Sequence, residues 1–422
     1  MLHSRPFYYL ENFSTALQWL QRRYGDLLDD TEQGFIQRFY EIPRASAALL
    51  VRMIGRKGDL FFTAKLRYAE IGCPSAAGAT LIELGWVHSE PPLQLDWCPE
   101  VPEALYRLTV RPLCERLRLL FFGQFDQDWS QFVLKDLGIF KYETVPLETA
   151  SRAFQRRDHL DTFCRLYLCR QQLEEGAEPE SVLASLPEAV TDNEWLEGHR
   201  RRVQFRIAHR CERQKDFDRA LRIYRECQYP GSRLRMLRML ERLGHSTEAL
   251  QLATTVREAP ADEVEVQQVT RMWPRLQRKA GLIAHRNRAA QGWPTFQLTL
   301  PVAERPAHLE QATGEMLSAP DAPVYYVENG LIHSLFGLLC WDAIFAPVPG
   351  AFFHEFQAAP ADLHAPEFYA RRADVFTRCL GQLETNAYRD TIGGNFEQKA
   401  GIQSPFVSWG LISKPLLDLA LG

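Results

Sequence analysis

The 422-residue sequence lacks the marks of several specialised protein classes. Its nine cysteines form no Cys-x-x-Cys pair and no short Cys/His cluster, which argues against a zinc module and favours buried, reduced thiols. The N-terminus has no apolar segment followed by a small-residue cleavage site, so no secretory signal is predicted. The longest apolar stretch, Gly330 to Phe345, contains His333 and Asp342 and is too short to span a bilayer comfortably. We therefore expect a soluble, cytoplasmic protein without a membrane partner.

The composition also lacks a strong bias of either charge. Hydrophobic residues make up 46% and charged residues 24% of the chain, values that exclude long disorder and fibrous repeats. At 422 residues the chain is too long for one ordinary core, so two to four domains are expected. The net charge of -4 is unfavourable for a DNA-binding protein, but an average over the whole chain hides local surpluses of one sign.

Residues 1–90 have the pattern of a winged-helix-like DNA-binding module. Apolar residues spaced by three or four predict a helix from residue 7 to about 28, and further helices are predicted at 35–40, 45–54 and 76–84. Gly55 and Gly85 end the last two of these helices. The apolar pair Trp86 and Val87 then predicts a short strand, which completes the module.

The rest of the chain is divided by composition. Residues 91–104 are rich in Pro and acidic residues and are predicted to be a linker. Residues 105–284 are predicted to form a helical domain, with a strong helix over 105–143 and two tetratricopeptide-like helix pairs over 199–255. Residues 285–422 form the last predicted domain, with a strand at 296–300 and a helix from Glu328 to about Ile344. The expected fold class is mainly α with a minor α/β part.

Basic residues are concentrated between Arg200 and Arg242. This segment has 14 basic residues against 5 acidic ones, a surplus of about nine positive charges, and nearly all the basic residues are arginine. The planar arginine fork binds phosphate oxygens in pairs, which favours a phosphate-binding surface. The alternative is a solvated helix face with intrahelical ion pairs. The candidate DNA- or phosphate-binding residues, including a smaller N-terminal group, are Arg200, Arg201, Arg202, Arg206, Arg210, Arg213, Arg52, Arg56 and Lys57.

The segment from Val327 to Phe345, VENGLIHSLFGLLCWDAIF, resembles the helix that opens the nuclease domain of bacterial Fanconi-associated nucleases. These proteins carry a virus-type replication-repair nuclease (VRR-NUC) domain of the PD-(D/E)XK type. Similar residues occur at 349–352, 356–357, 360–363 and 368–372, and near the N-terminus at 8–13 and 51–61. The resemblance therefore extends over nearly the whole chain.

The resemblance implies a DNA repair enzyme that cleaves branched DNA. Members of the family are 5′-flap endonucleases and 5′-to-3′ exonucleases in interstrand crosslink repair, and they use Mg²⁺ or Mn²⁺. Their active site combines a helix-borne Glu with a Pro-Asp and a Glu-Val-Lys motif. Glu328 matches the helix-borne Glu, so the resemblance implies that Glu328 is a catalytic residue and a metal ligand.

The sequence departs from the family pattern after Glu328. No Pro-Asp followed by Glu-Val-Lys occurs there, and Glu397-Gln398-Lys399 is interpreted as an accidental match among turn residues. A two-metal displacement needs several carboxylates. We therefore expect a parent nuclease of which this chain holds only the opening part of the nuclease domain, with its core truncated, and we expect the chain to be inactive alone. Members of the family also tend to have a SAP-like helical segment after the winged-helix part, and residues 91–104 are expected to be a shortened form of it. The alternatives are a non-catalytic module that binds branched DNA or a 5′-phosphate, and a helical-repeat scaffold for protein partners.

Overall fold

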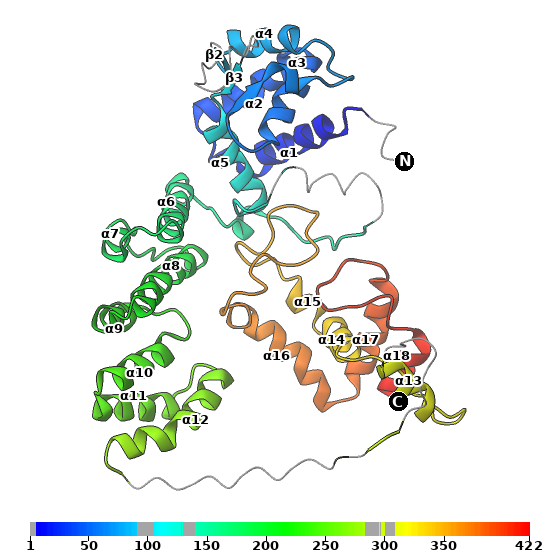
Figure 1. Ribbon diagram of the computed structural model, residues 1–422. Coiled ribbons are helices and arrows are strands. Elements are labelled where there is room, and N and C mark those ends of the chain that lie inside the picture. The colour runs from blue at the N-terminus through cyan, green and yellow to red at the C-terminus, as the bar shows by residue number, and fades with distance from the viewer. Residues whose placement is uncertain are drawn as a thin grey trace. The chain divides into compact units, whose positions relative to one another are not determined.

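The computed structural model describes residues 6–90, 105–127, 129, 140–282, 295, 297–299 and 309–422. The chain separates into two compact units. Unit 1 combines Met1–Arg157 with Gly330–Gly422, and unit 2 is Asp158–Asn329. The described residues are mostly helical and contain one small sheet, which confirms the predicted fold class at this level (Figure 1).

The N-terminal part of unit 1 begins with four helices close to the predicted positions. In α2 a capping box holds the first turn, because Asp29 accepts from the Glu32 amide and Glu32 accepts from the Asp29 amide. Glu32 is fully buried and also binds Arg116 and Arg157, which compensate its charge. The helices are α1 (Tyr8–Tyr24), α2 (Asp30–Glu41), α3 (Arg44–Ile54) and α4 (Pro74–Glu83).

A three-stranded antiparallel sheet of order β1-β3-β2 accompanies these helices. It consists of β1 (Leu60–Phe62), β2 (Val87–Glu90) and β3 (Leu105–Leu108). The helix predicted over 105–143 is therefore wrong at its start, because residues 105–108 pair with strands about 20 and 45 residues earlier. The helix that follows, α5 (Arg111–Phe122), ends at Gly123, where the backbone is left-handed.

Gly123 is expected to tolerate no side chain. Its φ is +72°, and a Cβ at this position would lie 2.2 Å from ring atoms of Phe353. Gly123→Ala should therefore lower the free energy of unfolding by about 2–4 kcal/mol, measured by urea denaturation. Gly58→Ala is the matched control, because Gly58 has φ +82° and open space around it. Equal losses of about 1 kcal/mol in both variants would contradict the close approach of Phe353.

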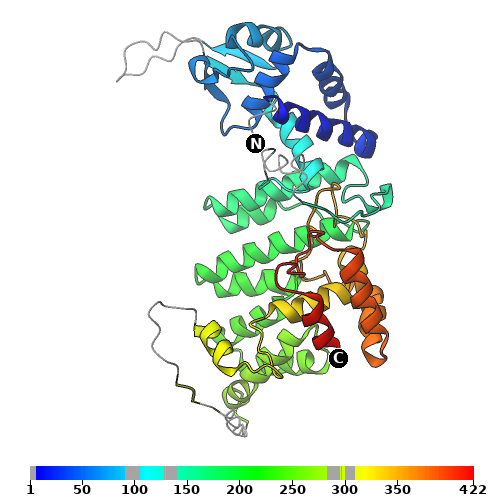
Figure 2. The ribbon, with the colours of Figure 1, turned by 90° about the vertical axis from the view of Figure 1, so that its right-hand side faces the viewer.

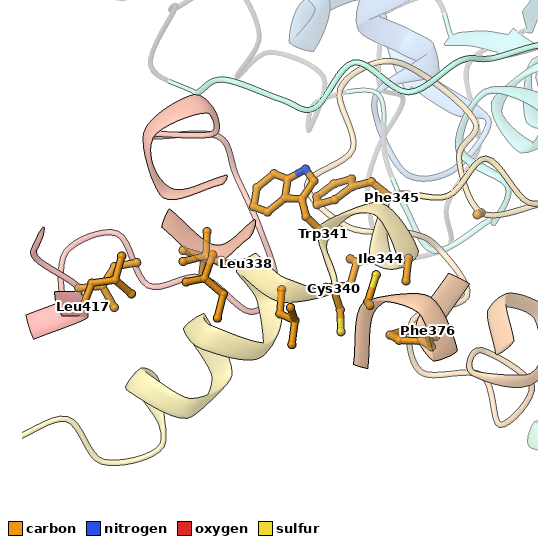
Figure 3. Close-up of a cluster of buried hydrophobic side chains, with 14 of the residues drawn as sticks. Leu338, Cys340, Trp341, Ile344, Phe345, Phe376 and Leu417 are labelled. Carbon is orange, nitrogen blue, oxygen red and sulfur yellow. The ribbon is translucent and has the colours of Figure 1, made fainter. Parts of the chain in front are cut away.

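The C-terminal part of unit 1 is built around Trp341. Its ring packs on Phe345, with centroids 4.8 Å apart, and Figure 3 shows both beside Ile344 and Phe376 in the same core. The helix predicted from Glu328 to Ile344 is present but starts at Gly330 and is interrupted at Cys340. The helices here are α14 (Gly330–Leu339), α15 (Trp341–Ile344), α16 (Ala373–Gly381), α17 (Ala387–Gln398) and α18 (Lys414–Leu421).

Residues 330–422 pack directly on the N-terminal part of unit 1. The Trp19 indole N–H donates to the Phe353 carbonyl over 3.1 Å. The His354 ring stacks on Phe121, with centroids 4.8 Å apart and planes 11° apart. The predicted domain limits at 105 and 285 thus differ from the limits of the compact units, which fall after Arg157 and after Asn329.

Unit 2 consists of helices that pack in sequence order, α8 on α9, α9 on α10, α10 on α11 and α11 on α12. The buried Ala220 and Ala249 allow close approach of neighbouring helices. Figure 2 shows these helices as successive layers, and α8 to α11 occupy the region predicted to form two helix pairs, 199–255. The helices are α6 (Arg157–Glu174), α7 (Pro179–Ala184), α8 (Glu194–Arg213), α9 (Phe217–Glu226), α10 (Ser232–Leu243), α11 (Ser246–Glu258), α12 (Glu263–Lys279) and α13 (Leu309–Leu317).

Some expectations concern residues outside the described ranges. The predicted linker at 91–104 lies there entirely, as do Phe296 and Leu300 of the predicted strand, while 297–299 lie in no strand. Eight cysteines are described; six of them are buried as expected, but Cys73 is exposed. In the described part of the chain, no helix is both long and apolar enough to cross a membrane.

Candidate nucleic-acid interface

The candidate interface in unit 2 centres on α8. The Asn193 side chain caps this helix by accepting from the Leu196 amide, and Val203, Ile207 and Cys211 bury one of its faces. Residues 202, 206, 210 and 213 are spaced by four, four and three, so they share another face. We call this set the α8 arginine stripe: Arg202, Arg206, Arg210 and Arg213.

Three of the six arginines predicted in this region are engaged by carboxylates. Arg200 binds Glu197 over 3.1 Å and also donates to the Pro187 carbonyl. Arg201 binds Glu194 over 2.7 Å, and Arg206 binds Glu174 over 3.2 Å. The charges of these arginines are therefore partly neutralised by the protein's own carboxylates, which weakens their attraction for a phosphate.

The other three arginines of the region lie on the stripe and have free charge. Within the described residues, Arg202, Arg210 and Arg213 form no ion pair, and the buried Nε of Arg210 has no hydrogen-bond partner. Arg202 and Arg213 are exposed. The stripe therefore presents cationic donors whose counter-charge must come from solvent ions or from a bound anion.

Arg206 has other guanidinium groups close to its own. Burial, together with the guanidinium groups of Arg202 and Arg170, holds the pKa of Arg206 below its ordinary value. Glu174 opposes this effect but is shared, because it also lies 3.4 Å from the Arg170 Nε. The guanidinium groups of Arg202 and Arg170 thus repel that of Arg206, and an anionic oxygen placed there would relieve the repulsion.

The sequence-based count of charges missed contributions from distant helices. Only acids within 200–242 were counted, whereas Glu174, Glu180, Glu248 and Glu265 come from α6, α7, α11 and α12 and pair with arginines of this segment. Arg170 on α6 was missed for the same reason. These four carboxylates therefore offset part of the surplus of nine charges that residues 200–242 carry.

The smaller N-terminal group, Arg52, Arg56 and Lys57, also contains both an ion-paired residue and exposed ones. Arg52 binds Glu70 over 2.8 Å, and its guanidinium lies 3.8 Å from the Tyr9 ring centroid and 4.7 Å from that of Tyr68. Arg52 is thus held by one carboxylate and two aromatic rings, a position typical of a structural cation. Two residues just after α3 are exposed: Arg56, which donates to the Lys65 carbonyl over 3.2 Å, and Lys57. They remain available to an external anion.

Glu328 lies just before α14. It is exposed, and its φ of +43° is in the left-handed region, which is uncommon for a residue other than glycine and occurs often at functional sites. The Tyr326 hydroxyl donates to Glu328 Oε2 over 3.4 Å. The interpretation of Glu397-Gln398-Lys399 as turn residues is wrong, because Glu397 lies in α17 and Lys399 caps it, with the Lys399 ammonium on Glu143 at 2.9 Å.

The described residues do not by themselves provide a complete metal site. A carboxylate oxygen of Glu328 is a suitable ligand for a hard divalent cation. Among the residues with described positions, however, no group of three or more His, Cys, Asp or Glu side chains could hold a metal ion. The role of Glu328 as a metal ligand therefore stays a prediction.

Comparison with known proteins decides the family. Residues 7–88 match the family model described as "FAN1, HTH domain". A Fanconi-associated nuclease 1 homolog of Pseudomonas aeruginosa is 45% identical over 461 aligned positions, covering 99% of this chain and 82% of that protein. The chain belongs to the Fanconi-associated nuclease family. This result confirms the family resemblance that motifs near both ends of the sequence indicated.

Solved structures of the family agree with this assignment. A crystal structure of paFAN1 bound to a 2-nucleotide 5′-flap DNA with a gap has a TM-score of 0.84 and 44% identity, covering 99% of this chain and 85% of that one. Its complex with a 1-nucleotide 5′-flap DNA has a TM-score of 0.82. The Fanconi-associated nuclease 1 homolog of Arabidopsis thaliana is 23% identical, and the match covers 98% of this chain but 58% of the plant protein.

Proposed function

We propose that this chain binds 5′-flap DNA as part of a structure-specific DNA repair nuclease. The observation that carries the proposal is the match over 99% of the chain to paFAN1 in complex with 5′-flap DNA containing a gap. In this proposal residues 1–90 act as a winged-helix-like module, unit 2 as a tetratricopeptide-like scaffold and residues 330–422 as the opening of a VRR-NUC domain.

The proposed DNA contacts use the free cations described above. The α8 arginine stripe would bind phosphates, because each arginine can hold two phosphate oxygens with its planar fork. Arg56 and Lys57 would add a second contact from unit 1. Arg52, Arg200 and Arg201 are expected to support these regions through their ion pairs and to contribute little to DNA affinity.

Glu328 is proposed as one ligand of Mg²⁺ or Mn²⁺. The metal would supply Lewis-acid activation of the phosphodiester when bound. Glu328→Ala is expected to lower 5′-flap cleavage at least about 100-fold, with flap-DNA affinity changed less than about twofold. The measurement compares cleavage and fluorescence anisotropy for the chain alone and for the chain joined to a core that contains Pro-Asp and Glu-x-Lys.

Glu384→Ala is the matched control, because Glu384 is an exposed carboxylate of residues 330–422 that has no proposed role at the site. Unchanged cleavage in the Glu328→Ala variant would remove Glu328 from the reaction. A second candidate function, flap-DNA binding without cleavage, is favoured for the chain alone, because the described residues contain no group of three or more side chains that could hold a metal ion. Cleavage by the 422-residue chain alone would reject this second candidate.

A further inference from the structure

Large apolar side chains are exposed immediately before Glu328. Val324, Tyr325 and Tyr326 occupy consecutive positions, and Tyr326 is the most exposed of the three, with 57% of its surface accessible. No ring of the described residues packs against Tyr326. An exposed aromatic ring lacks the stabilisation that burial would give it. Its position beside a candidate catalytic carboxylate therefore favours a role in binding a ligand.

The Tyr326 hydroxyl and the Glu328 carboxylate form one local group. The hydroxyl donates to Glu328 Oε2 over 3.4 Å, at the long end for this type of bond. The left-handed backbone at Glu328 lets side chains two residues apart meet.

In the absence of a bound cation, the charges at this point disfavour contact between Tyr326 and the DNA backbone. Glu328 and Glu310 both act electrostatically on Tyr326, so the local field is negative and repels phosphates. A neutral aromatic ring gains affinity for nucleic acid by stacking on bases, which contributes about 1–3 kcal/mol per base without regard to sequence. Only unpaired bases expose a free face to such a ring, and a flap or a gap provides them.

We propose that Tyr326 is a nucleobase-stacking and positioning residue: its ring stacks on an unpaired base of the flap or gap, and its hydroxyl orients the Glu328 carboxylate. This inference rests on the proposed function and adds to it the residue that recognises single-stranded nucleotides next to Glu328. The two roles belong to different atoms of one side chain, so different substitutions separate them.

The stacking role is tested without metal, in EDTA, with gapped 5′-flap DNA that carries 2-aminopurine at single positions along the flap and gap. Stacking on a tyrosine ring quenches this base. We expect quenching at one position with the unmodified chain and with Tyr326→Phe, and its loss with Tyr326→Leu together with an increase in Kd of roughly fivefold or more. Tyr369→Leu is the matched control, because Tyr369 is also an exposed tyrosine, at 55%.

The positioning role is tested in the chain joined to a nuclease core. Tyr326→Phe should raise the Mn²⁺ concentration for half-maximal cleavage several-fold and leave the quenching unchanged. Equal quenching in Tyr326→Leu and the unmodified chain would overturn the stacking role, and an unchanged Mn²⁺ dependence in Tyr326→Phe would overturn the positioning role. The affinity of the unmodified chain for flap DNA tests the proposed function separately. If the unmodified chain does not bind this DNA, the proposed function fails and no base is quenched at any position.

Discussion

Asp362→Asn is expected to lower the free energy of unfolding by about 3–5 kcal/mol. Asp362 is 5% exposed and accepts from Arg371 over 2.6 Å and from both terminal nitrogens of Arg372 over 2.8 Å. The Arg372 side chain is fully buried. Asp362 is the only carboxylate that the described residues place within ion-pair distance of Arg371 and Arg372. Its removal would leave the buried Arg372 guanidinium without an ion-pair partner and Arg371 with only the more distant Glu367, and the amide of Asn cannot neutralise them.

Urea denaturation of the full chain measures this effect, with the circular dichroism signal as the probe. Asp374→Asn is the matched control, since Asp374 is an exposed carboxylate in the first turn of α16 and should change stability by less than about 0.5 kcal/mol. A loss below about 1 kcal/mol for Asp362→Asn would show that solvent reaches the two arginines.

Replacing Arg202, Arg210 and Arg213 together by Gln is expected to weaken 5′-flap DNA binding by on the order of 100-fold at 50–100 mM salt. Each phosphate contact releases about one condensed counterion, so the slope of log Kd against log salt should fall by about 2.7 when three contacts are lost. Fluorescence anisotropy titrations at four salt concentrations measure both quantities.

A second triple variant removes the same charge from arginines that already have partners. Arg222, Arg225 and Arg233 bind Glu180, Glu248 and Glu265, so their replacement by Gln should change the salt slope by less than about one. Equal changes in the two variants would mean that affinity follows the net charge of unit 2 and is not localised on the α8 arginine stripe.

The helices of both units could largely be predicted from local patterns. The apolar spacing in residues 7–54 and 199–255 corresponds to α1 to α3 and α8 to α11, because a buried helical face imposes this period. The strand at 105–108 could not be predicted, since it is stabilised by pairing with 60–62 and 87–90 and carries only a four-residue pattern of its own. Pairing with strands that lie far away in the sequence is not visible in the residue pattern of a short segment.

The candidate site was predicted only in part. The concentration of arginine was visible in the sequence, but the choice between free and paired arginines depends on Glu174, Glu180, Glu248 and Glu265, which other helices bring near. Glu328 was identified by resemblance alone. Its left-handed backbone and its contact with Tyr326 came from the structure.

The sequence by itself determined the family, the helical character of both units and the place of the arginine-rich segment, because these depend on motifs, periodicity and composition within short windows. Tertiary structure decided which chain segments share a core and which charges stay free. Residues 330–422 pack with the N-terminal part of unit 1, across more than 170 intervening residues, through contacts such as Trp19 with Phe353. Burial and ion pairing act through space, so only the folded chain shows that the stripe keeps three uncompensated arginines.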